Sequence, residues 1–331
     1  MKIIILLLFT LLITGCNKDN GSEIFQHYRN NSIDIKDKIK EIDLGDVCVS
    51  SSSRPVVAGN FLIITDFKAY ETPINIFDIN TYKHIVSFGI VGQGPTEIAN
   101  MGDVAWNRET HELYVTDHGK LEILAFNMDS VIRDSAYPPA TKFRLNRSSF
   151  PADYYYLNDS VSFCRTIEPI GNNDFCPNAG IWNMMTGDIE VFRYKHPEID
   201  KNRFMLAVSY SDSIYAECNV LNDLISIFDL NGTLLHNIYG PLWGDTDLHF
   251  FGVSLFTKEY LVTAYNGKKY NDHEPTTSII IFTKKGEYVA TLELGYRTSF
   301  FCYDEINNRL IFCFDDEIQF GYIDINELRL N

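Results

Sequence analysis

Basic residues are scarce in this chain. It holds 28 lysines and arginines against 44 aspartates and glutamates, which leaves a net charge of −16. Binding to nucleic acid needs a basic face that displaces counterions from the phosphates, and docking on anionic lipid needs one too, so the balance argues against both. The GxSxG, HExxH and SxxK signatures are missing, as are the cysteine and histidine spacings of zinc sites. No catalytic residue is assigned from the sequence.

Helical patterning and long apolar runs are missing as well. No long stretch has the 3.6-residue apolar period of an amphipathic helix, and residues 22–38 leave room for one short helix at most. The one apolar run, residues 3–13, is far short of the roughly 20 residues that span a bilayer. Because 45% of the residues are apolar and 14% aromatic, the chain can still bury a large core.

The apolar run follows Lys2 and ends in residues 12–16 (LITGC), an arrangement that resembles the lipobox of bacterial lipoproteins. The resemblance implies that residues 1–15 are a signal peptide and that Cys16 is diacylated and begins the mature chain. Two acyl chains anchor a protein stably, so the implied location is the cell envelope, at either face of the outer membrane. Residues 16–38 are then expected to be a tether. The alternative is a short buried strand with a core cysteine.

Six further cysteines follow. A hairpin centred on residues 307–308 would place Cys302 opposite Cys313, and an extracytoplasmic compartment would permit a disulfide there. The alternative is that both cysteines pack as small hydrophobic side chains.

A repeat predicts the fold. An apolar strand ending in an aromatic, a polar residue and a turn recurs at intervals of about 40 to 56 residues, the range of a four-stranded propeller blade. The copies are residues 74–80, 121–127, 180–183, 225–229, 279–283 and 320–324. Each follows a second run rich in β-branched and aromatic residues, which is typical of a strand. These runs are residues 61–66, 112–117, 160–165, 212–217, 259–264 and 309–314.

Six copies predict an all-β, six-bladed β-propeller of four-stranded antiparallel blades over residues 39–331. The last copy lacks a fourth strand. Residues 39–44 are expected to form a strand that precedes the first complete blade and belongs to none of the other blades. If that N-terminal strand pairs into the last blade, the ring closes and no edge is left exposed. A pair of β-sandwiches is the competing fold.

Residues 88–97 (FGIVGQGPTE), 103–106 (DVAW) and 114–120 (YVTDHGK) carry a family resemblance. They resemble NHL-type repeats and, more closely, the six-bladed β-propeller lipoproteins often described as TolB-like. The resemblance implies the same fold over residues 39–331. It implies little about function, since most such lipoproteins have no assigned activity.

Polar residues at the ends of the second strands are the candidate site. In a propeller these ends lie beside the blade crossovers, at the mouth of the central channel. The predicted mouth residues are Asp66, Asp117, His118, Arg165, Glu217, Asn266, Tyr270 and Asp315. Such a ring could bind a hard cation such as Ca²⁺, or the hydroxyls of a sugar. The alternative is that Asp66 and Asp117 accept hydrogen bonds from the backbone of their own turns.

We therefore expect a lipid-anchored propeller without enzymatic activity, which binds a carbohydrate, peptide or protein partner through its loop-rich face. The alternatives are a metal-assisted hydrolase, lactonase or lyase that uses the carboxylates around the channel, and a structural subunit of an envelope complex. Nucleic acid is not among the expected partners.

Overall fold

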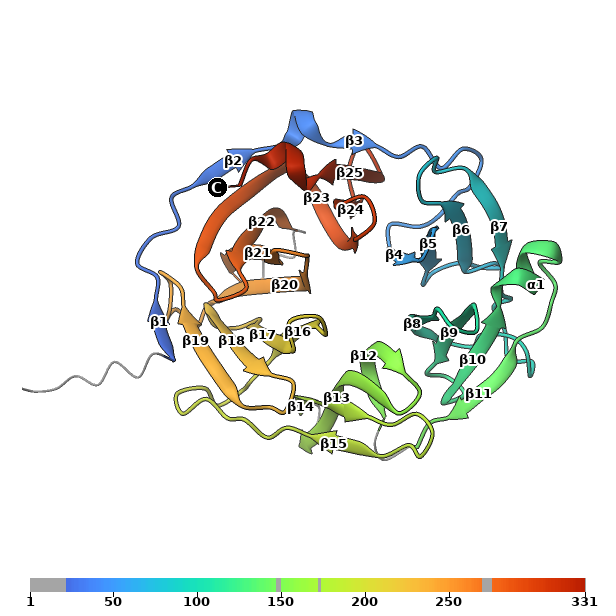
Figure 1. Ribbon diagram of the computed structural model, residues 1–331, viewed down its shortest axis with the longest axis horizontal. Helices are drawn as coiled ribbons and strands as arrows, with labels where there is room; N and C mark the ends of the chain where they lie inside the picture. Colours follow the sequence, from blue (N-terminus) through green and yellow to red (C-terminus); the bar gives the residue numbers. More distant parts are fainter. Residues whose placement is uncertain (1–21, 147–149, 172–173, 270–275, 331) are drawn as a thin grey trace, which may run out of the picture.

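The computed structural model describes residues 22–146, 150–171, 174–269 and 276–330, and its sheets stand around a central axis (Figure 1). The prediction of an all-β propeller with antiparallel sheets is confirmed, and the pair of β-sandwiches is excluded. The predicted signal peptide and Cys16 lie outside the described residues.

Within the described residues the strands form five hydrogen-bonded sheets. From the axis outward, the first is β4 (Ser53–Ala58), β5 (Phe61–Asp66), β6 (Ile74–Asp78) and β7 (His84–Phe88). The second is β8 (Met101–Asn107), β9 (Glu112–Asp117), β10 (Glu122–Asn127) and β11 (Ala140–Arg144). The third is β12 (Pro151–Asn158), β13 (Val161–Gly171), β14 (Asp174–Trp182) and β15 (Ile189–Val191).

The last two sheets include strands from the N-terminal segment. The fourth is β16 (Phe204–Ser209), β17 (Ile214–Asn219), β18 (Leu224–Asp229), β19 (Leu234–Tyr239) and β1 (Glu23–Phe25). The fifth is β20 (Leu248–Phe256), β21 (Tyr260–Lys269), β22 (Thr276–Thr283), β23 (Tyr288–Asp304), β24 (Arg309–Phe314), β25 (Phe320–Asp324) and β3 (Lys40–Glu41), and β2 (Ser32–Asp34) pairs with β23. The described helices are short: η1 (Lys36–Lys38), α1 (Met128–Arg133) and η2 (Ile325–Leu328).

Strand β23 belongs both to the strands β20–β22 before it and to the strands β24 and β25 after it. It is continuous over 17 residues, and its first part pairs with β22 whereas its last part pairs with β24. Between the two parts, Gly295 has a φ of +69°, a backbone conformation that glycine adopts without strain. A Cβ at Gly295 would lie 2.5 Å from Lys36 Cδ. The strand therefore leaves the outer edge of one set and becomes the inner strand of the next.

The repeat located the second and third strands well. The predicted second-strand runs coincide with β5, β9 and β24 and lie within a few residues of β13, β17 and β21. Their residues are almost all buried because each sheet packs against a neighbour on both faces. Helix α1 has no counterpart in the prediction: it begins after Asn127, whose side chain accepts a hydrogen bond from the Ser130 N–H at 3.0 Å.

The N-terminal strand closes the ring, as predicted. Strand β3 pairs antiparallel with β25, with Glu41 opposite Gly321, and the Ile42 N–H donates a hydrogen bond to the Phe320 carbonyl at 2.9 Å. Ile42 is 3% exposed and packs with core residues of the first and last sheets, among them Leu62. The pairing removes an edge that would otherwise expose backbone hydrogen-bonding groups.

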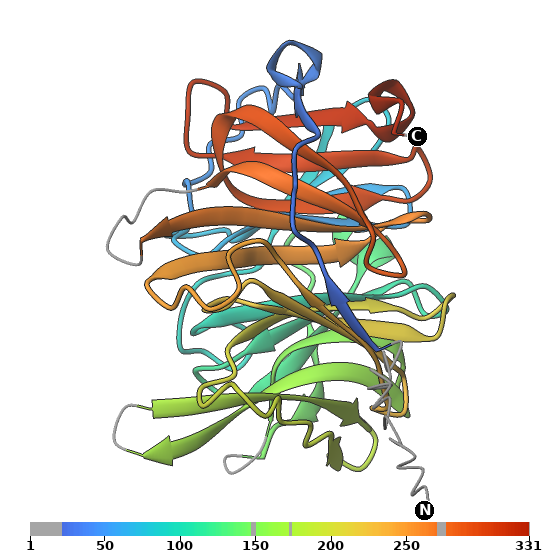
Figure 2. The ribbon, with the colours of Figure 1, turned by 90° about the vertical axis from the view of Figure 1, so that its left-hand side faces the viewer.

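The prediction of a tether over residues 16–38 is wrong for its described part, residues 22–38. Strand β1 pairs parallel with β19, and β2 pairs parallel with β23. Figure 2 shows this blue segment crossing the outer edges of the yellow and orange strands before it reaches β3. Apolar contacts hold this segment in place: Ile35 is fully buried in the core beside Leu292, and the exposed Phe25 stacks on Tyr239 with ring centres 4.4 Å apart.

Arg29 fixes the middle of this segment. Its Nη1 lies 2.7 Å from Asp223 Oδ1, and the two side chains are 7% and 0% exposed. Its guanidinium carbon lies 5.3 Å from the ring centre of Phe282, 5.7 Å from that of Tyr265 and 5.8 Å from that of Phe251. Because Asp223 belongs to the turn between β17 and β18 and the rings belong to the fifth sheet, the arginine joins two sheets.

The predicted register of the last hairpin is wrong by two residues. Cys302 lies opposite Ile311, and Cys313 lies opposite Phe300. The Asp304 carboxylate accepts hydrogen bonds from two N–H groups of the turn, and this shifts the centre of the hairpin toward the N-terminus. Cys302 and Cys313 are both free.

Arg29→Ala is expected to lower the free energy of unfolding by about 3–5 kcal/mol, because it leaves the buried Asp223 carboxylate without its partner. Arg29→Ala combined with Asp223→Asn should be less destabilised than Arg29→Ala alone, since no buried charge is then unpaired. Urea unfolding measures both effects. Lys40→Ala is the matched control: it removes an exposed ion pair of the same segment, with Glu327, and should leave the midpoint unchanged. Equal losses for Arg29→Ala and Lys40→Ala would contradict the role assigned to Arg29.

Candidate functional site

Asp66 holds the connection between β3 and β4. Its Oδ2 accepts a hydrogen bond from the Ser50 N–H at 2.8 Å, and its Oδ1 accepts one from the Lys68 N–H at 2.9 Å and another from the Ser50 hydroxyl. The residue is 6% exposed. The carboxylate therefore ties the end of β5 to a neighbouring loop.

Asp117 has the same position in the second sheet and even more partners. It is fully buried, and its carboxylate accepts hydrogen bonds at 2.8–3.2 Å from the N–H groups of Ala99, Asn100, Gly119 and Lys120. Four donors match the roughly four lone-pair sites of a carboxylate. The geometry is that of a turn aspartate, which joins the crossover before β8 to the turn after β9.

The other predicted mouth residues are dispersed. Glu217 is 7% exposed and accepts a hydrogen bond from Asn202 Nδ2 at 3.1 Å. Asn266 is half-buried on β21, and within the described part of the chain its buried Oδ1 has no hydrogen-bond partner. Asp315 is exposed after the end of β24. Tyr270 lies outside the described residues.

His118 packs closely against β8. A Cβ at Gly102 would lie 2.3 Å from His118 Nε2, so the ring occupies the space above a residue that must be glycine. Its ring centre lies 5.8 Å from that of Phe150. Burial lowers the pKa of His118, against the charges of Asp117 and Asp153. The ring is therefore neutral near pH 7.

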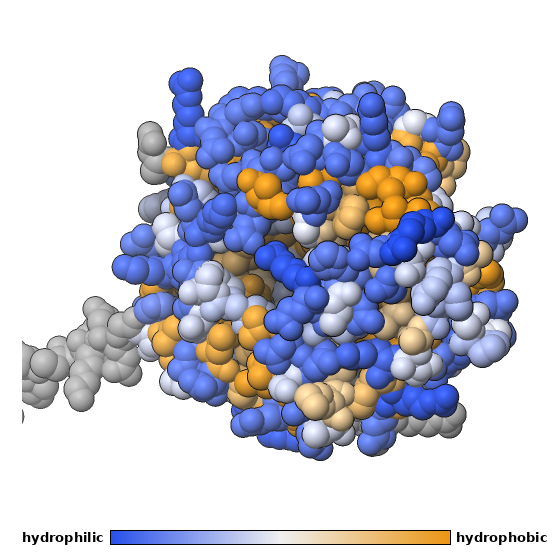
Figure 3. Space-filling view, turned by 45° about the vertical axis from the view of Figure 1, so that its right-hand side comes forward, coloured by the Kyte–Doolittle hydropathy of each residue, from blue (hydrophilic) through white to orange (hydrophobic). Residues whose placement is uncertain are grey.

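A cavity of about 980 Å³ occupies the centre of the ring. Its wall is formed by the inner strands β4, β8, β12, β16 and β20 and by the last part of β23, the strands nearest the axis in Figure 1. Small-molecule sites commonly measure about 300–1,000 Å³. Figure 3 shows a hollow near the middle of one face, bordered largely by hydrophilic side chains.

Arg165 is the predicted residue that lines this cavity. Its Nε donates a hydrogen bond to Asp153 Oδ2 at 2.9 Å, Nη2 donates to the same oxygen, and Nη1 donates to the Phe204 carbonyl at 3.1 Å. Burial alone would lower the pKa of Arg165, but the adjacent Asp153 carboxylate outweighs it and raises the pKa. The pair lies where β12 and β16 begin, at the end of the cavity where the chain crosses from sheet to sheet (the crossover end).

Asp103 lines the same end of the cavity. Burial, together with the charge of Asp153, raises the pKa of Asp103 to about 6, although the carboxylate accepts a hydrogen bond from the Tyr154 N–H at 3.2 Å. The positive charge of Arg54 acts in the opposite direction. Asp103 can therefore exchange a proton near neutral pH, which is common in functional sites.

Arg54 completes the crossover end. Its guanidinium carbon lies 4.4 Å from the ring centre of Phe67 and 5.2 Å from that of Phe300. Phe67 follows β5 and Phe300 lies on β23, so the guanidinium stands between the first and last sheets. All three residues line the cavity.

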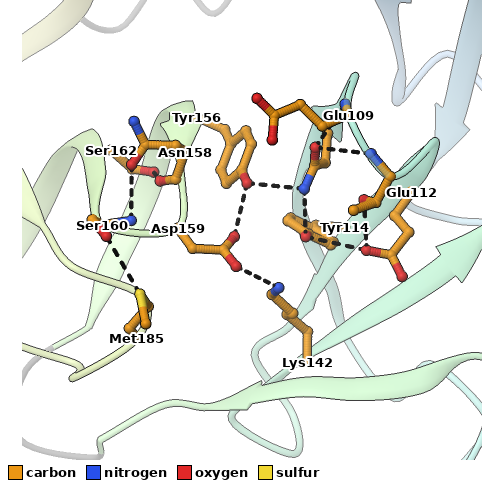
Figure 4. Close-up of polar contacts among 12 residues, drawn as sticks. Glu109, Glu112, Tyr114, Lys142, Tyr156, Asn158, Asp159, Ser160, Ser162 and Met185 are labelled. Atoms are coloured by element: carbon orange, nitrogen blue, oxygen red, sulfur yellow. Dashed lines mark hydrogen bonds and ion pairs between the residues drawn. The ribbon is translucent and has the colours of Figure 1, made fainter.

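The opposite end of the cavity is bounded by the turns that follow the inner strands (the turn end). There Tyr156 donates a hydrogen bond to Asp159 Oδ1 at 2.7 Å, and Lys142 Nζ lies 2.6 Å from Asp159 Oδ2 (Figure 4). Asn107 Nδ2 donates to the hydroxyls of Tyr114 and Tyr156 at 2.9 and 3.1 Å. The network joins the second and third sheets and holds the Tyr156 ring in place.

Arg54, Asp103 and Asp153 were not among the predicted residues, because they lie on inner strands and not at the ends of the second strands. A usable signal was present. Each of the three is a charged residue near the start of an otherwise apolar or aromatic inner strand, in the segments SRPVVA, MGDVAW and PADYYY. A charge in a strand of this kind needs a polar environment, and in a propeller the axis supplies one.

No group of three or more histidine, cysteine, aspartate or glutamate side chains that could hold a metal ion occurs among the residues that the structure describes. Over the same residues, no helix has the length and apolar character needed to cross a bilayer.

Comparison with known proteins shows the fold. No family model matches the chain, and no curated protein matches its sequence. Among solved structures, a protein of Bacteroides fragilis described as a proposed exported protein is 12% identical with a TM-score of 0.53, over 88% of this chain and 87% of that one. Regucalcin, a calcium-binding protein of Agrobacterium tumefaciens, is 8% identical with a TM-score of 0.54, over 91% and 94% of the two chains. At these identities the similarity establishes a β-propeller and nothing about activity.

Asp117→Ala is expected to lower the free energy of unfolding by about 2–4 kcal/mol, because it leaves buried N–H groups without an acceptor. Asp315→Ala, at the equivalent but exposed position, should have no measurable effect. Thermal unfolding of both variants, with and without Ca²⁺, makes the comparison. An unchanged stability for Asp117→Ala together with loss of a Ca²⁺-dependent rise in Tm would contradict the turn role and favour a metal ligand.

Glu217→Gln is expected to stabilise the protein at pH 8 and to have no effect near pH 4. Burial raises the pKa of Glu217 from 4.5 to about 7, so between these pH values the native state holds a proton that the unfolded state releases. Ionisation of Glu217 therefore makes the free energy of unfolding fall as the pH rises, by about 3 kcal/mol in total. Urea unfolding at pH 4, 6 and 8 measures the difference between variant and parent.

Glu190→Gln, an exposed substitution on β15, is the control for the Glu217 experiment and should show no pH-dependent difference. A constant difference between Glu217→Gln and the parent across the range would contradict the assigned titration.

Proposed function

We propose that this protein is a binding propeller that holds a small ligand in the cavity at its centre. The observation that carries the proposal is the composition of the cavity wall. The wall combines charged side chains, such as Arg54 and Asp103, with aromatic side chains, such as Trp106 and Tyr156. A largely apolar cavity with a few convergent polar groups is the usual form of a small-molecule site.

We also infer that the ring has six blades. The count is supported by the double pairing of β23, which would make the fifth sheet two blades joined by one long strand. It is supported further by the six inner segments that wall the cavity. A ring of this kind matches the TolB-like or NHL-like propellers that the sequence resembles.

The proposed location is the cell envelope, with the protein anchored to the outer membrane by acyl chains on Cys16. The LITGC sequence supports this proposal, as does the description of the Bacteroides fragilis neighbour as a proposed exported protein. The described chain begins on the outer edge of the fourth sheet, so an anchor would tether the propeller by its rim. The proposed ligands are a carbohydrate, a peptide or an exposed part of a protein.

A cavity-filling variant tests the proposal. Binding to an array of neutral and acidic oligosaccharides and short peptides is measured for the parent and for Val208→Trp, which places an indole in the cavity wall. Val208→Trp should abolish binding that the parent shows. Ile85→Trp on the outer strand β7, where Ile85 is 37% exposed, is the matched control and should bind as the parent does.

Two outcomes would redirect the proposal. Binding that survives Val208→Trp but is lost in Tyr70→Ala, a 96% exposed residue of the β5–β6 turn, would place the site on the loop-rich face. Conversion of a bound probe into product, absent in Asp103→Asn, would favour the hydrolase or lyase alternative, because the raised pKa of Asp103 suits a general acid.

A further inference from the structure

The charges of the cavity wall differ from those of the whole chain. The chain has 28 basic against 44 acidic residues, whereas the wall has three of each. The basic ones are Arg54, Arg108 and Arg165, and the acidic ones are Asp103, Asp153 and Glu305. The cavity is therefore much less acidic than the molecule around it, and an anion meets less repulsion there than elsewhere.

The three arginines are not equivalent. Arg165 is bound on one side by Asp153 and on the other by the Phe204 carbonyl, so its charge is already paired and three of its five N–H donors are used. Arg108 lies at the turn end, on the exposed turn after β8. Arg54 contacts two phenylalanine rings, and within the described residues its guanidinium donates no hydrogen bond and forms no ion pair. It is the cation at the crossover end that is available to a ligand.

The ring contacts of Arg54 also limit the movement of its guanidinium. A phenylalanine ring attracts the face of a guanidinium group and makes no hydrogen bond to its N–H edge. With Phe67 and Phe300 at 4.4 and 5.2 Å, the guanidinium loses little further freedom when it binds, while its N–H donors stay free. A planar fork of donors matches the two oxygens of a carboxylate.

Asp103 complements this arrangement. The charge of Arg54 acts on Asp103, and Asp103 keeps acceptor capacity beyond its hydrogen bond from the Tyr154 N–H. A ligand that places its carboxylate on Arg54 can place a neighbouring hydroxyl or amide N–H on Asp103. Arg165 neutralises Asp153, so this second carboxylate does not repel the ligand.

We propose that the crossover end of the cavity is a carboxylate subsite, in which the Arg54 guanidinium, held between Phe67 and Phe300, binds the carboxylate of an otherwise uncharged small ligand. This inference rests on the proposed function. Two sources could supply the group: the acid of a sugar, as in a uronate, or the free C-terminus of a short peptide. The shared chemistry is a carboxylate beside a hydrogen-bond donor.

Paired probes test the subsite. Binding of glucuronate is compared with that of glucose, and binding of N-acetyl-alanyl-alanine with that of its C-terminal amide, by calorimetric titration of the full-length protein. One acid should bind at least about tenfold more tightly than its neutral counterpart, and the preference should weaken as salt is added. The pair that shows the preference identifies the source of the carboxylate.

Arg54→Gln should abolish the preference while lowering Tm only slightly, because Arg54 is exposed and its two ring contacts are weak at an exposed site. Arg108→Gln removes the same charge at the turn end and should keep the preference. Loss of the preference to the same degree in both variants would show a general charge effect and overturn the subsite.

The two proposals fail in different ways. If acids and neutral counterparts bind equally and Val208→Trp blocks both, the carboxylate subsite is wrong and the cavity remains the binding site. If none of the four probes binds the parent protein, the subsite is wrong; if the oligosaccharide and peptide array also gives no binding, the proposed function is wrong as well.

Discussion

The closure of the ring is the constraint on which the cavity depends. Each sheet of a propeller packs against two neighbours, so the first and last sheets must meet if neither is to expose an apolar face. Here they meet through Leu62 and Ile311, with Ile42 of the N-terminal segment packed against both sheets. The hydrogen bonds between β3 and β25 hold that segment in place. The wall of the cavity is continuous only because this junction is closed.

The proposed subsite lies on the same junction. Arg54 comes from β4, near the start of the ring, and Phe300 comes from β23, near its end, yet the guanidinium lies 5.2 Å from the ring centre. An opening of the ring would separate the two. The N-terminal segment thus affects the cavity without touching it, because β1, β2 and β3 join the outer edges of the last sheets. The pairing of the N-terminal strands at the rim therefore supports the positions of Arg54 and Phe300 at the axis.

The sequence predicted the middle strands of each sheet better than it predicted the site. Runs such as residues 61–66 are buried on both faces, so they are mostly apolar and easy to recognise. The inner strands mix polar and aromatic residues because one edge borders water, and that pattern resembles a loop. Short edge strands such as β1 carry too few apolar residues for any periodicity. The predicted partner of Cys302 is two residues from the observed one because side-chain hydrogen bonds of Asp304, and not composition, set the centre of the hairpin.

The conspicuous aspartates illustrate a related limit. Asp117 is conspicuous in the sequence because a carboxylate at the end of an apolar strand is unusual. In the structure, its carboxylate is there to accept hydrogen bonds from four backbone N–H groups. Asp103 attracts little notice, and it is the carboxyl group of the two that faces open space. The sequence shows that a carboxylate is present. The number of hydrogen-bond donors around it decides whether the carboxylate keeps a free acceptor site for a ligand.

The contrast between the acidic surface and the balanced cavity narrows the ligands that fit the proposal. A polyanion is repelled by the net charge of −16 over the whole approach, whereas a single carboxylate feels that repulsion weakly at physiological salt. Inside the cavity it meets Arg54, whose aromatic neighbours favour an uncharged body beside the acid. The arrangement therefore favours a ligand with one negative charge on a neutral frame, and it disfavours nucleotides and highly sulfated sugars of the same size.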